Sequence, residues 1–538
     1  MKPLWKALGP NRPLFLFALF AGEFFVSVSI LSTTVSGEVV TSVISNSDRR
    51  AAILTAYIVL SALQVILSQV DMYSTEKFKI RQKEHLRRAS FRAFSCIGGA
   101  DHKAISGFVS FINNDIPCLT EQYFAGTIDI IKCITMLTFS ACSLLYIHWV
   151  MAAVVLGVSV MIVLAPKWLG KKDGKVREEL SKGLGRYNAI LQSFLNGKNL
   201  IKAYLYQQRS NELLDLENRR VEKAESAVMK RSLLIYSITG VLQVSKTVLI
   251  FIIGLFLIGV GQISIGSLVA VIQLAAIISS PIEVLAYLFH AKNEVRPMLE
   301  RFNDLTASYE KAQPEAGKDV GRAQEITVSH LSYSVGGLTI LKDISIQFQR
   351  GKKYVIMGES GSGKSTFLRL LSHIGDDSYE GDILMNSTDI SDISPKSFYS
   401  EVRPVFQEPY MFFASLEENI CLGRDIPQNL YRGVVSKLNL DRLLERYGGE
   451  EIAPETVEKM SGGEKQRIAL ARAMVGRPSV YLLDEITSAL DPENARIIEA
   501  AILSEDAMVI NISHRMPPEW RARYDQMLNL KDGRLLYL

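Results

Sequence analysis

The chain has 538 residues, with a hydrophobic fraction of 48% and a charged fraction of 22%, and it exceeds the length of one compact domain. Its formal net charge is only +4, so no overall field favours a nucleic-acid partner and we expect none. Long apolar runs fill roughly the first 300 residues, whereas the remainder has the pattern of a soluble α/β domain.

Six apolar stretches predict membrane-spanning helices, since a bilayer core requires about 20 mostly apolar residues. They lie at 14–35, 52–71, 121–146, 148–166, 233–259 and 266–290. The second and fourth contain long segments without any charged residue, which a helix in a soluble core rarely sustains on every face. We therefore predict a membrane α-helical domain with six spans.

The loops predict the orientation of these spans. Lys and Arg are concentrated in the long segments between the second and third spans and between the fourth and fifth spans, whereas the opposite loops are short. Basic loops lie on the cytoplasmic side of membranes. We expect a multi-pass protein of the cell membrane with both termini and the C-terminal domain in the cytoplasm.

Some ionisable residues fall within the predicted spans, among them Glu23, Asp129, Lys132, Lys246 and Glu283. A charge in hydrocarbon is costly, so each should face a cavity, a partner or a membrane edge. Glu23 and Lys246 lie deepest by position. The sequence leaves three alternatives for them: a substrate cavity, pairing between helices or placement near a membrane interface.

The apolar periodicity stops around 306–324, where Pro314, Gly317 and Gly321 lie among charged residues. An alternating pattern resumes at Ile326. We predict a transmembrane domain at 1–305, a linker at 306–322 and a second domain at 323–538.

The strongest local pattern is a phosphate-binding loop between an apolar strand and a Leu-rich helix. The residues are Gly358, Glu359, Ser360, Gly361, Ser362, Gly363, Lys364, Ser365 and Thr366. The glycines allow backbone N–H groups to converge on the phosphates of ATP, and Lys364 supplies a positive charge. Ser365 offers a hydroxyl to Mg²⁺. The pattern predicts a P-loop NTPase of the α/β class.

An apolar run at 479–483 predicts a central strand that ends at Asp484 and Glu485. Hydrolysis of ATP needs a metal ligand and a carboxylate that polarises water. We assign these roles to Asp484 and Glu485, respectively.

Three further elements accompany the phosphate loop. Gln407 follows an apolar strand, and His514 follows another, where it can contact a γ-phosphate. A helix opens with donors for a second phosphate, formed by Ser461, Gly462, Gly463 and Glu464. Each element alone is weak evidence, but the ordered set is specific.

With these motifs, essentially the whole chain resembles an ATP-binding cassette (ABC) transporter of the exporter type. The resemblance implies that 358–365 are the Walker A loop, Ser461–Glu464 the signature, Asp484–Glu485 Walker B and 488–491 the D-loop. It also implies that Gln407, in the Q-loop, is a metal ligand linked to the membrane domain, and that His514 is the switch histidine. Segments near 97–107 and 188–197 are then candidates for coupling helices.

Three positions depart from the family pattern. Glu464 replaces the usual Gln, and 451–458 replaces a glycine-bearing segment before the signature. The adenine-stacking aromatic normally falls at the position of Val335. Tyr333 shares a strand face with Val335, so either side chain could lie against the base.

The resemblance implies that each ATP is bound by the Walker A loop of one chain and the signature of another. Because one full set is present, we expect a homodimer, with a related half-transporter as the alternative. Active export is the leading hypothesis, with peptide ranked first and a lipid or amphipathic drug second. An ATP-gated regulator that does not pump is a different class, and intact Glu485 argues against it.

Overall fold

The computed structural model describes residues 2–45, 48–95, 102–169, 173–311, 317–375, 378–447, 452, 454–487, 490–513 and 518–538. They form two compact units. The first comprises Met1–Ser90 and Phe108–Asp304, and the second comprises Phe91–Gly107 and Leu305–Leu538.

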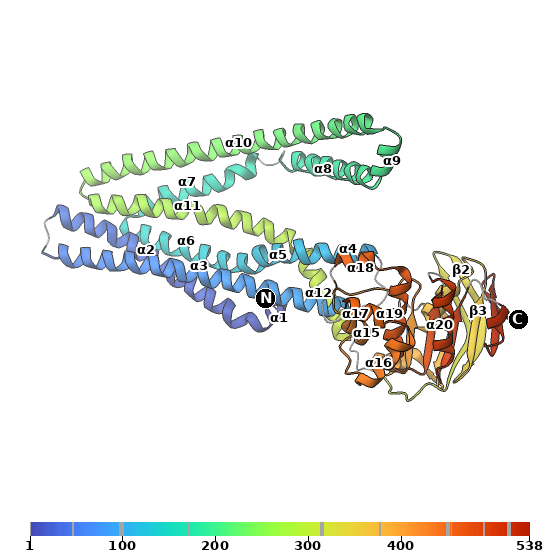
Figure 1. The fold of residues 1–538 in the computed structure, drawn as a ribbon. Coiled ribbons are helices and arrows are strands. Elements are labelled where there is room, and N and C mark those ends of the chain that lie inside the picture. Colours follow the sequence, from blue (N-terminus) through green and yellow to red (C-terminus); the bar gives the residue numbers. More distant parts are fainter. Residues whose placement is uncertain are drawn as a thin grey trace. The chain divides into compact units, whose positions relative to one another are not determined.

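Long helices build the first unit, and three of them include residues of the second unit (Figure 1). Their bounds are α1 Lys2–Leu8, α2 Arg12–Ile44, α3 Arg50–Ser95, α4 His102–Ser110, α5 Ile116–Cys118, α6 Gly126–Ile147, α7 Trp149–Leu169, α8 Asp173–Asn196, α9 Lys198–Ala203, α10 Gln207–Gly259, α11 Ile265–Glu294 and α12 Arg296–Lys311. Two π-helical segments, Phe111–Asp115 and Leu119–Ala125, join α4, α5 and α6 into one helical run.

Four predicted spans fall on single α-helices of this unit, the third lies on the π-helical segment Leu119–Ala125 and α6, and the fourth begins one residue before α7. Within the described residues, five helical segments are long and apolar enough to cross a membrane: Leu4–Ile44, Arg50–Ser95, Ala104–Ile147, Gln207–Gly259 and Ile265–Ile282. The predicted fourth span lies on α7, whose part Trp149–Ile162 is a shorter apolar helix. At 1.5 Å per residue, the 21 residues of α7 extend about 30 Å, which matches a bilayer core.

Helices α2, α6, α7, α10 and α11 pack around a common apolar core. The closest approach joins α2 to α11 at two glycines. A Cβ atom on Gly266 would lie 1.9 Å from the carbonyl oxygen of Gly37. Beside this contact, the hydroxyls of Thr41 and Ser264 are 2.9 Å apart. Small residues thus allow the backbones of α2 and α11 to approach closely, as is common at interfaces between membrane helices.

The charges within the spans pair between helices. Lys132 on α6 donates to both carboxylate oxygens of Asp71 on α3, at 2.9 and 3.1 Å. The same lysine lies 3.5 Å from Asp129. A Cβ atom on Gly22 would lie 2.4 Å from Lys132 Cδ, so glycine on α2 makes room for the pair. These contacts follow the pairing alternative rather than the cavity alternative.

Lys246 on α10 also pairs between helices. It is 2% exposed and donates to the carbonyl oxygen of Ala275 at 3.1 Å and to Ser279 Oγ at 2.5 Å, both on α11. Of the alternatives left open for Lys246, these contacts match pairing between helices. Glu23 is half-buried, and its Oε1 has no hydrogen-bond partner within the described part of the chain. The side chain of Glu283 lies outside the described residues.

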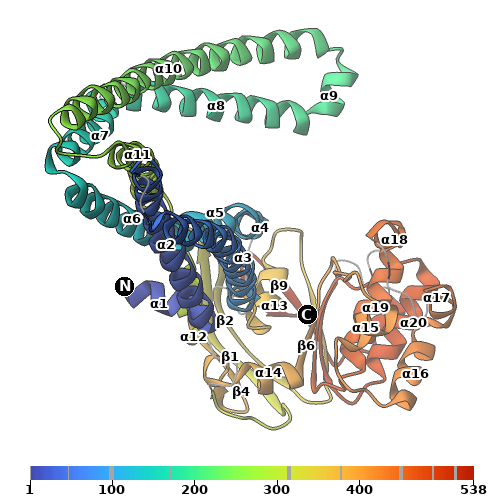
Figure 2. The same cartoon turned by 90° about the vertical axis from the view of Figure 1, so that its left-hand side faces the viewer.

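A long helical hairpin connects α8 to α10 through the short helix α9 (Figure 2). The prediction placed the second coupling helix at 188–197, but 188–196 are the last turns of α8. The short helix begins after Gly197, a poor helix former, and spans Lys198–Ala203. For the other candidate, 97–101 lie outside the described residues, and 102–107 open α4.

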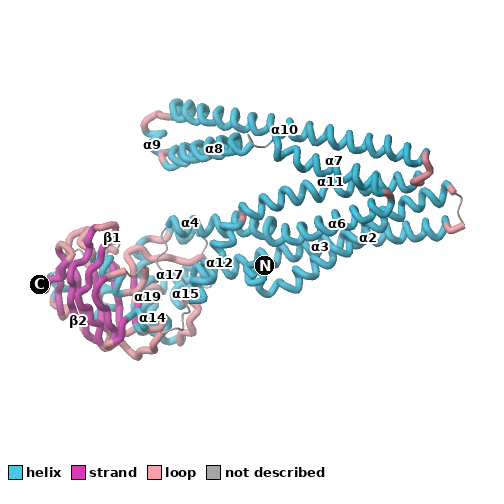
Figure 3. The backbone as a smooth tube through the Cα atoms, turned by 180° about the vertical axis from the view of Figure 1, so that it is seen from behind, coloured by secondary structure: helices cyan, strands magenta, loops and turns pink. Residues whose placement is uncertain are grey.

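Two sheets organise the second unit, as the strands in Figure 3 show. A six-stranded sheet has the order β10-β9-β3-β8-β7-β6, in which β10 pairs antiparallel and the other pairs are parallel. Its strands are β3 Lys353–Met357, β6 Val402–Val405, β7 Val480–Asp484, β8 Met508–Ile512, β9 Gln526–Lys531 and β10 Arg534–Tyr537. Every residue of β7 and β8 is buried, as expected for central parallel strands.

The second sheet is antiparallel, with the order β2-β1-β4-β5. Its strands are β1 Glu325–Val335, β2 Leu338–Gln349, β4 Glu380–Met385 and β5 Thr388–Asp389. The helices of the unit are α13 Lys364–Leu371, α14 Pro395–Glu401, α15 Leu416–Cys421, α16 Gln428–Lys437, α17 Asp441–Tyr447, α18 Pro454–Lys459, α19 Gly462–Met474, α20 Pro492–Leu503 and α21 Pro518–Arg521. One apolar core lies between the sheets and α13, and another lies under α15 to α20.

The fold class is as predicted: a membrane α-helical region followed by an α/β P-loop domain. The predicted linker overlaps the end of α12, and its last part is fixed to the second domain. Lys318 forms a bridge to Ile393, and Val320 N donates to Ser397 Oγ at 3.0 Å. The proposed boundaries at 305 and 322 stay predictions.

Candidate active site

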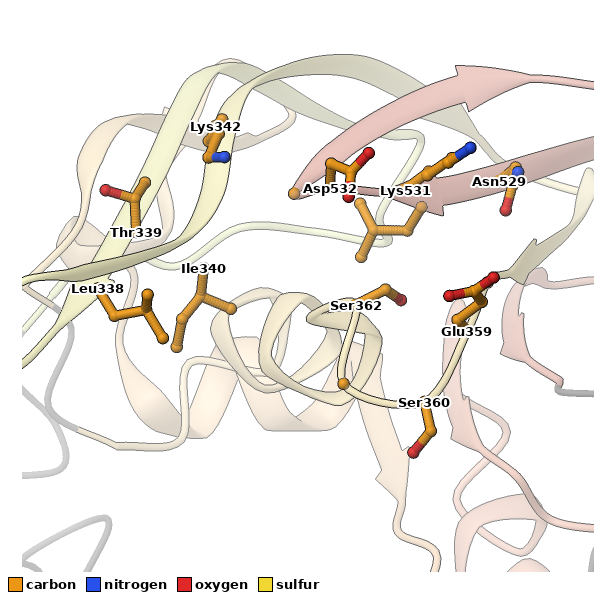
Figure 4. A pocket seen from close by; sticks show the side chains of 14 residues that line it. Leu338, Thr339, Ile340, Lys342, Glu359, Ser360, Ser362, Asn529, Lys531 and Asp532 are labelled. Carbon is orange, nitrogen blue, oxygen red and sulfur yellow. The ribbon is translucent and has the colours of Figure 1, made fainter.

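The phosphate loop connects β3 to α13 (Figure 4). Three of its glycines have positive φ angles: 153° at Gly358, 83° at Gly361 and 99° at Gly363. A Cβ atom at Gly358 would also lie 2.4 Å from the carbonyl oxygen of Leu530. The loop conformation therefore requires glycine at Gly358 and favours it at the other two positions.

Lys364 is the first residue of α13 and is 4% exposed. Its Nζ donates to the carbonyl oxygens of Gly358 at 2.9 Å and Glu359 at 2.7 Å. Burial lowers the pKa of Lys364, while the carboxylates of Glu485 and Asp484 act in the opposite direction. Lys364 thus lies under the loop, with acidic groups close enough to favour its charged form.

A cavity of about 760 Å³ borders the loop, within the size range of small-molecule sites. Its other walls come from β2 and from the β9–β10 turn. The lining residues are Leu338, Thr339, Ile340, Lys342, 358–362 and 529–533 (Figure 4). The residues outside the loop could not be predicted from the sequence, because strands distant in the chain supply them and no local motif marks them.

Tyr333, the predicted adenine-stacking residue, does not line this cavity. Its side chain packs in the core between the sheets and is 7% exposed, and its hydroxyl lies 3.3 Å from an Arg369 nitrogen that donates to it. Val335 on the same strand is 51% exposed. Burial leaves Tyr333 little surface to offer a base, and Val335 does not line the cavity either, so the residue that lies against the base stays open.

The predicted catalytic carboxylates lie at the end of β7. Ser365 Oγ donates to Asp484 Oδ1 at 3.2 Å, which joins the phosphate loop to this strand. Gln407 Nε2 donates to Glu485 Oε2 at 2.9 Å. Glu485 has φ = 51°, a left-handed conformation that is uncommon outside glycine and recurs at functional sites. Four predicted residues from three separate segments are thus brought together.

The oxygen donors of this cluster suit a magnesium ion. Mg²⁺ binds through one or two carboxylates or hydroxyls, with phosphate and water completing its shell. Ser365 and Asp484 present such oxygens side by side, and Gln407 retains its amide oxygen beside Glu485. Among the described residues, no group of three or more His, Cys, Asp or Glu side chains lies close enough together to hold a metal ion.

The signature residues open α19 with a capping box. Ser461 Oγ accepts from Glu464 N at 3.2 Å, and Glu464 Oε2 accepts from Ser461 N at 2.8 Å. Glu464 is thus compatible with the helix start, since either Glu or Gln at this position can reciprocate the serine cap. The N–H groups of Gly462 and Gly463 lie at the positive end of a helix of 13 residues, which favours an anion.

Comparison with known families agrees with this geometry. A model described as the ABC transporter transmembrane region matches residues 14–282, and a model described as ABC transporter matches residues 341–488. The chain belongs to the ABC transporter family. It is a multi-pass membrane protein in which an ATPase domain couples ATP hydrolysis to transport.

Relatives of this ABC transporter match most of its length. A probable ABC transporter ATP-binding/permease protein of Haemophilus influenzae is 26% identical, over 99% of this chain and 98% of its own. The β-(1→2)glucan export protein NdvA of Agrobacterium vitis is 26% identical, over 68% and 63%. The ATP-dependent lipid A-core flippase of Neisseria meningitidis is 25% identical, over 78% and 69%.

The fold of this ABC transporter matches that of a bacterial Atm1-family ABC exporter solved with ATP bound. The TM-score is 0.75 at 19% sequence identity, and the match covers 98% of this chain and 94% of the other. The exporter fold thus extends across both units.

Two predicted elements of the transporter lie partly outside the described residues. These are His514 and residues 488–489 of the D-loop. The described chain ends β8 at Ile512, two positions before His514. The described residues resume at Leu490. Asp491 then caps α20, because its carboxylate accepts hydrogen bonds from Glu493 N and Asn494 N at 3.1 and 3.0 Å.

Proposed function

We propose that two copies of this chain form an exporter with two shared ATP sites, with a related half-transporter as the alternative second subunit. Each chain carries one phosphate loop and one signature, and in the described structure the two belong to different elements, α13 and α19. Large apolar side chains are exposed along α3 and α10, including Ile58, Val65 and Phe256. Such surface is available to lipid or to a second chain.

The observation that carries the proposal is the contact between Gln407 and Glu485 beside Asp484 and Ser365. In this arrangement Gln407 orients the Glu485 carboxylate, which then polarises the attacking water. Lys364 exchanges its loop carbonyl partners for the phosphates of ATP. His514 contacts the γ-phosphate from the segment after β8.

Ser365, Asp484 and Gln407 would hold Mg²⁺. When bound, this ion neutralises the charge that develops on the phosphates. The signature residues Ser461, Gly462, Gly463 and Glu464 of the second chain would bind the same ATP from the other side, through the N-terminus of α19.

The chemical energy is proposed to act through closure of the two nucleotide-binding domains in the cytoplasm. ATP favours the outward-facing state because it binds the closed pair of domains more tightly than the separated pair. Hydrolysis and phosphate release then restore the inward-facing state. The segments Phe91–Gly107 and Lys198–Ala203 are the proposed coupling elements, the first because it clusters with the second unit.

We propose a lipid or amphipathic compound as the exported substrate. A relative is named as a lipid A-core flippase and another as a glucan exporter, whereas neither name refers to a peptide. The peptide ranked first by the sequence analysis is thus without support from these relatives. Glu23, with a buried carboxylate oxygen that is unpartnered among the described residues, is a proposed contact for a polar headgroup.

The test uses the purified chain in proteoliposomes. ATP is added to the outer buffer, so that it reaches only those transporters whose nucleotide-binding domains lie outside the vesicle. Fluorescent lipid, an amphipathic cationic dye and a labelled peptide are each measured for ATP-dependent movement into the lumen. Movement of the lipid or dye, and its loss in the Glu485→Gln variant, is expected. Movement of peptide alone contradicts the substrate proposal, and ATP turnover without movement of any of them favours the non-pumping regulator.

A further inference from the structure

Three buried side chains outside the ATP site form a hydrogen-bonded chain across the second unit. Asn511 Nδ2 donates to Tyr524 OH at 2.8 Å, and Tyr524 OH donates to Glu499 Oε1 at 3.0 Å. The three residues are 5%, 8% and 4% exposed, respectively. None of them belongs to an ATP-binding motif, so the fold buries a carboxyl group that the catalytic mechanism does not use.

This hydrogen-bonded network of three side chains joins two elements that flank the ATP site. Glu499 lies on α20, the helix that Asp491 caps directly after the D-loop. Asn511 lies on β8, the strand paired on one side with β3 and on the other with β7. In this register Ile512, next to Asn511, pairs with Asp484. A shift of α20 relative to β8 would therefore displace the strand that supports both the phosphate loop and the catalytic carboxylates.

A second contact fixes the far end of α20. Lys353 on β3 is 7% exposed, and its Nζ donates to the carbonyl oxygens of Glu505 at 2.7 Å and Ala507 at 2.6 Å. These carbonyls follow the last turn of α20. The segment at the end of α20 is thus attached to β3 by Lys353, and the helix itself is attached to β8 by the hydrogen-bonded network of Glu499, Tyr524 and Asn511. Only this network contains a carboxyl group whose charged form is disfavoured by burial.

The charge state of Glu499 decides how well this contact suits its surroundings. Burial raises the pKa of Glu499 to about 7, against the hydrogen bond from Tyr524 and the charge of Arg523, which lower it. Burial also raises the pKa of Tyr524, which therefore remains a donor at neutral pH. Within the described residues, Glu499 Oε2 and Asn511 Oδ1 have no hydrogen-bond partner, so the neutral acid fits this site better than the carboxylate.

We propose that Glu499, Tyr524 and Asn511 form a positioning relay that couples α20 to β8 and sustains ATP hydrolysis when Glu499 is neutral. Ionisation of Glu499 places an incompletely bonded charge between the two elements and loosens their contact. The proposal rests on the proposed catalytic role of Glu485, since the relay acts through the strands that position that residue.

The test measures kcat and KM for ATP from pH 6 to pH 8.5 with the full-length transporter in nanodiscs. The wild type should lose kcat in a step near pH 7. Glu499→Gln, which keeps the shape of the neutral acid, should remove this step and retain the activity seen at pH 6. Tyr524→Phe removes the donor that favours the carboxylate, so the step should move to higher pH, and kcat should fall about fivefold with KM unchanged.

The variants distinguish the relay from a purely structural role. Thermal unfolding at pH 6 reports whether each variant is folded, and Tyr524→Phe carries the test if Glu499→Gln is not. A wild type and a folded Glu499→Gln variant with the same pH profile would overturn the relay. So would a Tyr524→Phe step at the wild-type pH. Normal hydrolysis by Glu485→Gln would instead contradict the proposed catalytic role while leaving the profile differences interpretable.

Discussion

Charged side chains are used differently in the two units of this ABC transporter. In the second unit, Lys364, Asp484 and Glu485 lie close to one another at the phosphate loop, which itself borders a cavity. In the first unit, Lys132 and Lys246 form hydrogen bonds between helices. Charged residues thus mark the chemistry in the soluble domain, whereas in the membrane domain they first mark pairing between helices.

The largest effect should follow from removing the catalytic carboxylate. Glu485→Gln keeps the size of the side chain but cannot polarise water, so we expect ATPase activity to fall by about 10²- to 10⁴-fold. ATP binding, measured by displacement of a fluorescent nucleotide, should persist. Glu493→Gln, on an exposed turn of α20, is the matched control and should hydrolyse ATP normally. A comparable loss of ATPase activity in both variants would contradict the specific catalytic role of Glu485.

Breaking one membrane ion pair should destabilise the first unit. Lys132→Ala leaves Asp71 in the protein interior with no counter-charge from α6, which should cost about 3 kcal/mol. The measurement is the apparent unfolding temperature in detergent. The double variant Lys132→Ala with Asp71→Ala should recover much of the loss. If the single variant unfolds like the wild type but loses transport, the pair binds substrate and the comparison of the units fails.

Acidic pH should stabilise the second unit through Glu499. Its pKa is raised from 4.5 to about 7 in the folded chain, so between these values the unfolded chain loses this proton while the folded chain keeps it. Stability therefore falls as pH rises through this window, by about 3 kcal/mol in total, and stays lower above pH 7. The stability of Glu499→Gln relative to the wild type should accordingly rise between pH 5 and pH 8. A pH-independent difference would contradict the assigned pKa.

A smaller effect is expected at the closest contact of α2 and α11. Gly266→Ala forces a methyl group against the backbone of Gly37 and should cost about 2 kcal/mol. Gly240→Ala on α10 is the control, because an added Cβ would meet nothing within 4 Å. Thermal unfolding in detergent separates the two. Equal unfolding temperatures for both variants would show that this contact does not constrain the membrane helices.

The motifs of the ATP site could be predicted because each is a contiguous string with its own chemistry. Ser365, Gln407 and Asp484 were assigned from such strings, and the structure brings them together. The burial of Tyr333 could not be predicted from the sequence. Tyr333 and Val335 share one strand pattern, and only the packing of other elements against the strand makes one buried and the other exposed. The start of the short helix α9 at Lys198 depended on where α8 ends, which periodicity alone does not fix.

The roles of the membrane charges were also beyond the sequence. Lys132 meets Asp71 from 61 residues away, and no spacing rule links positions on different helices. The same reason hides the contact of Glu499 with Tyr524, in which two residues of ordinary appearance become a buried network only in the folded domain.

We propose that each ATP site is shared by two chains, and a complementation assay tests this sharing. Lys364→Ala disables the phosphate loop, and Ser461→Arg blocks the signature, so each variant alone should lack ATPase activity. When the two variants are co-expressed and purified as mixed assemblies, one intact phosphate loop should face one intact signature, and ATPase activity should return. Mixed assemblies that remain as inactive as either variant alone would contradict the shared site.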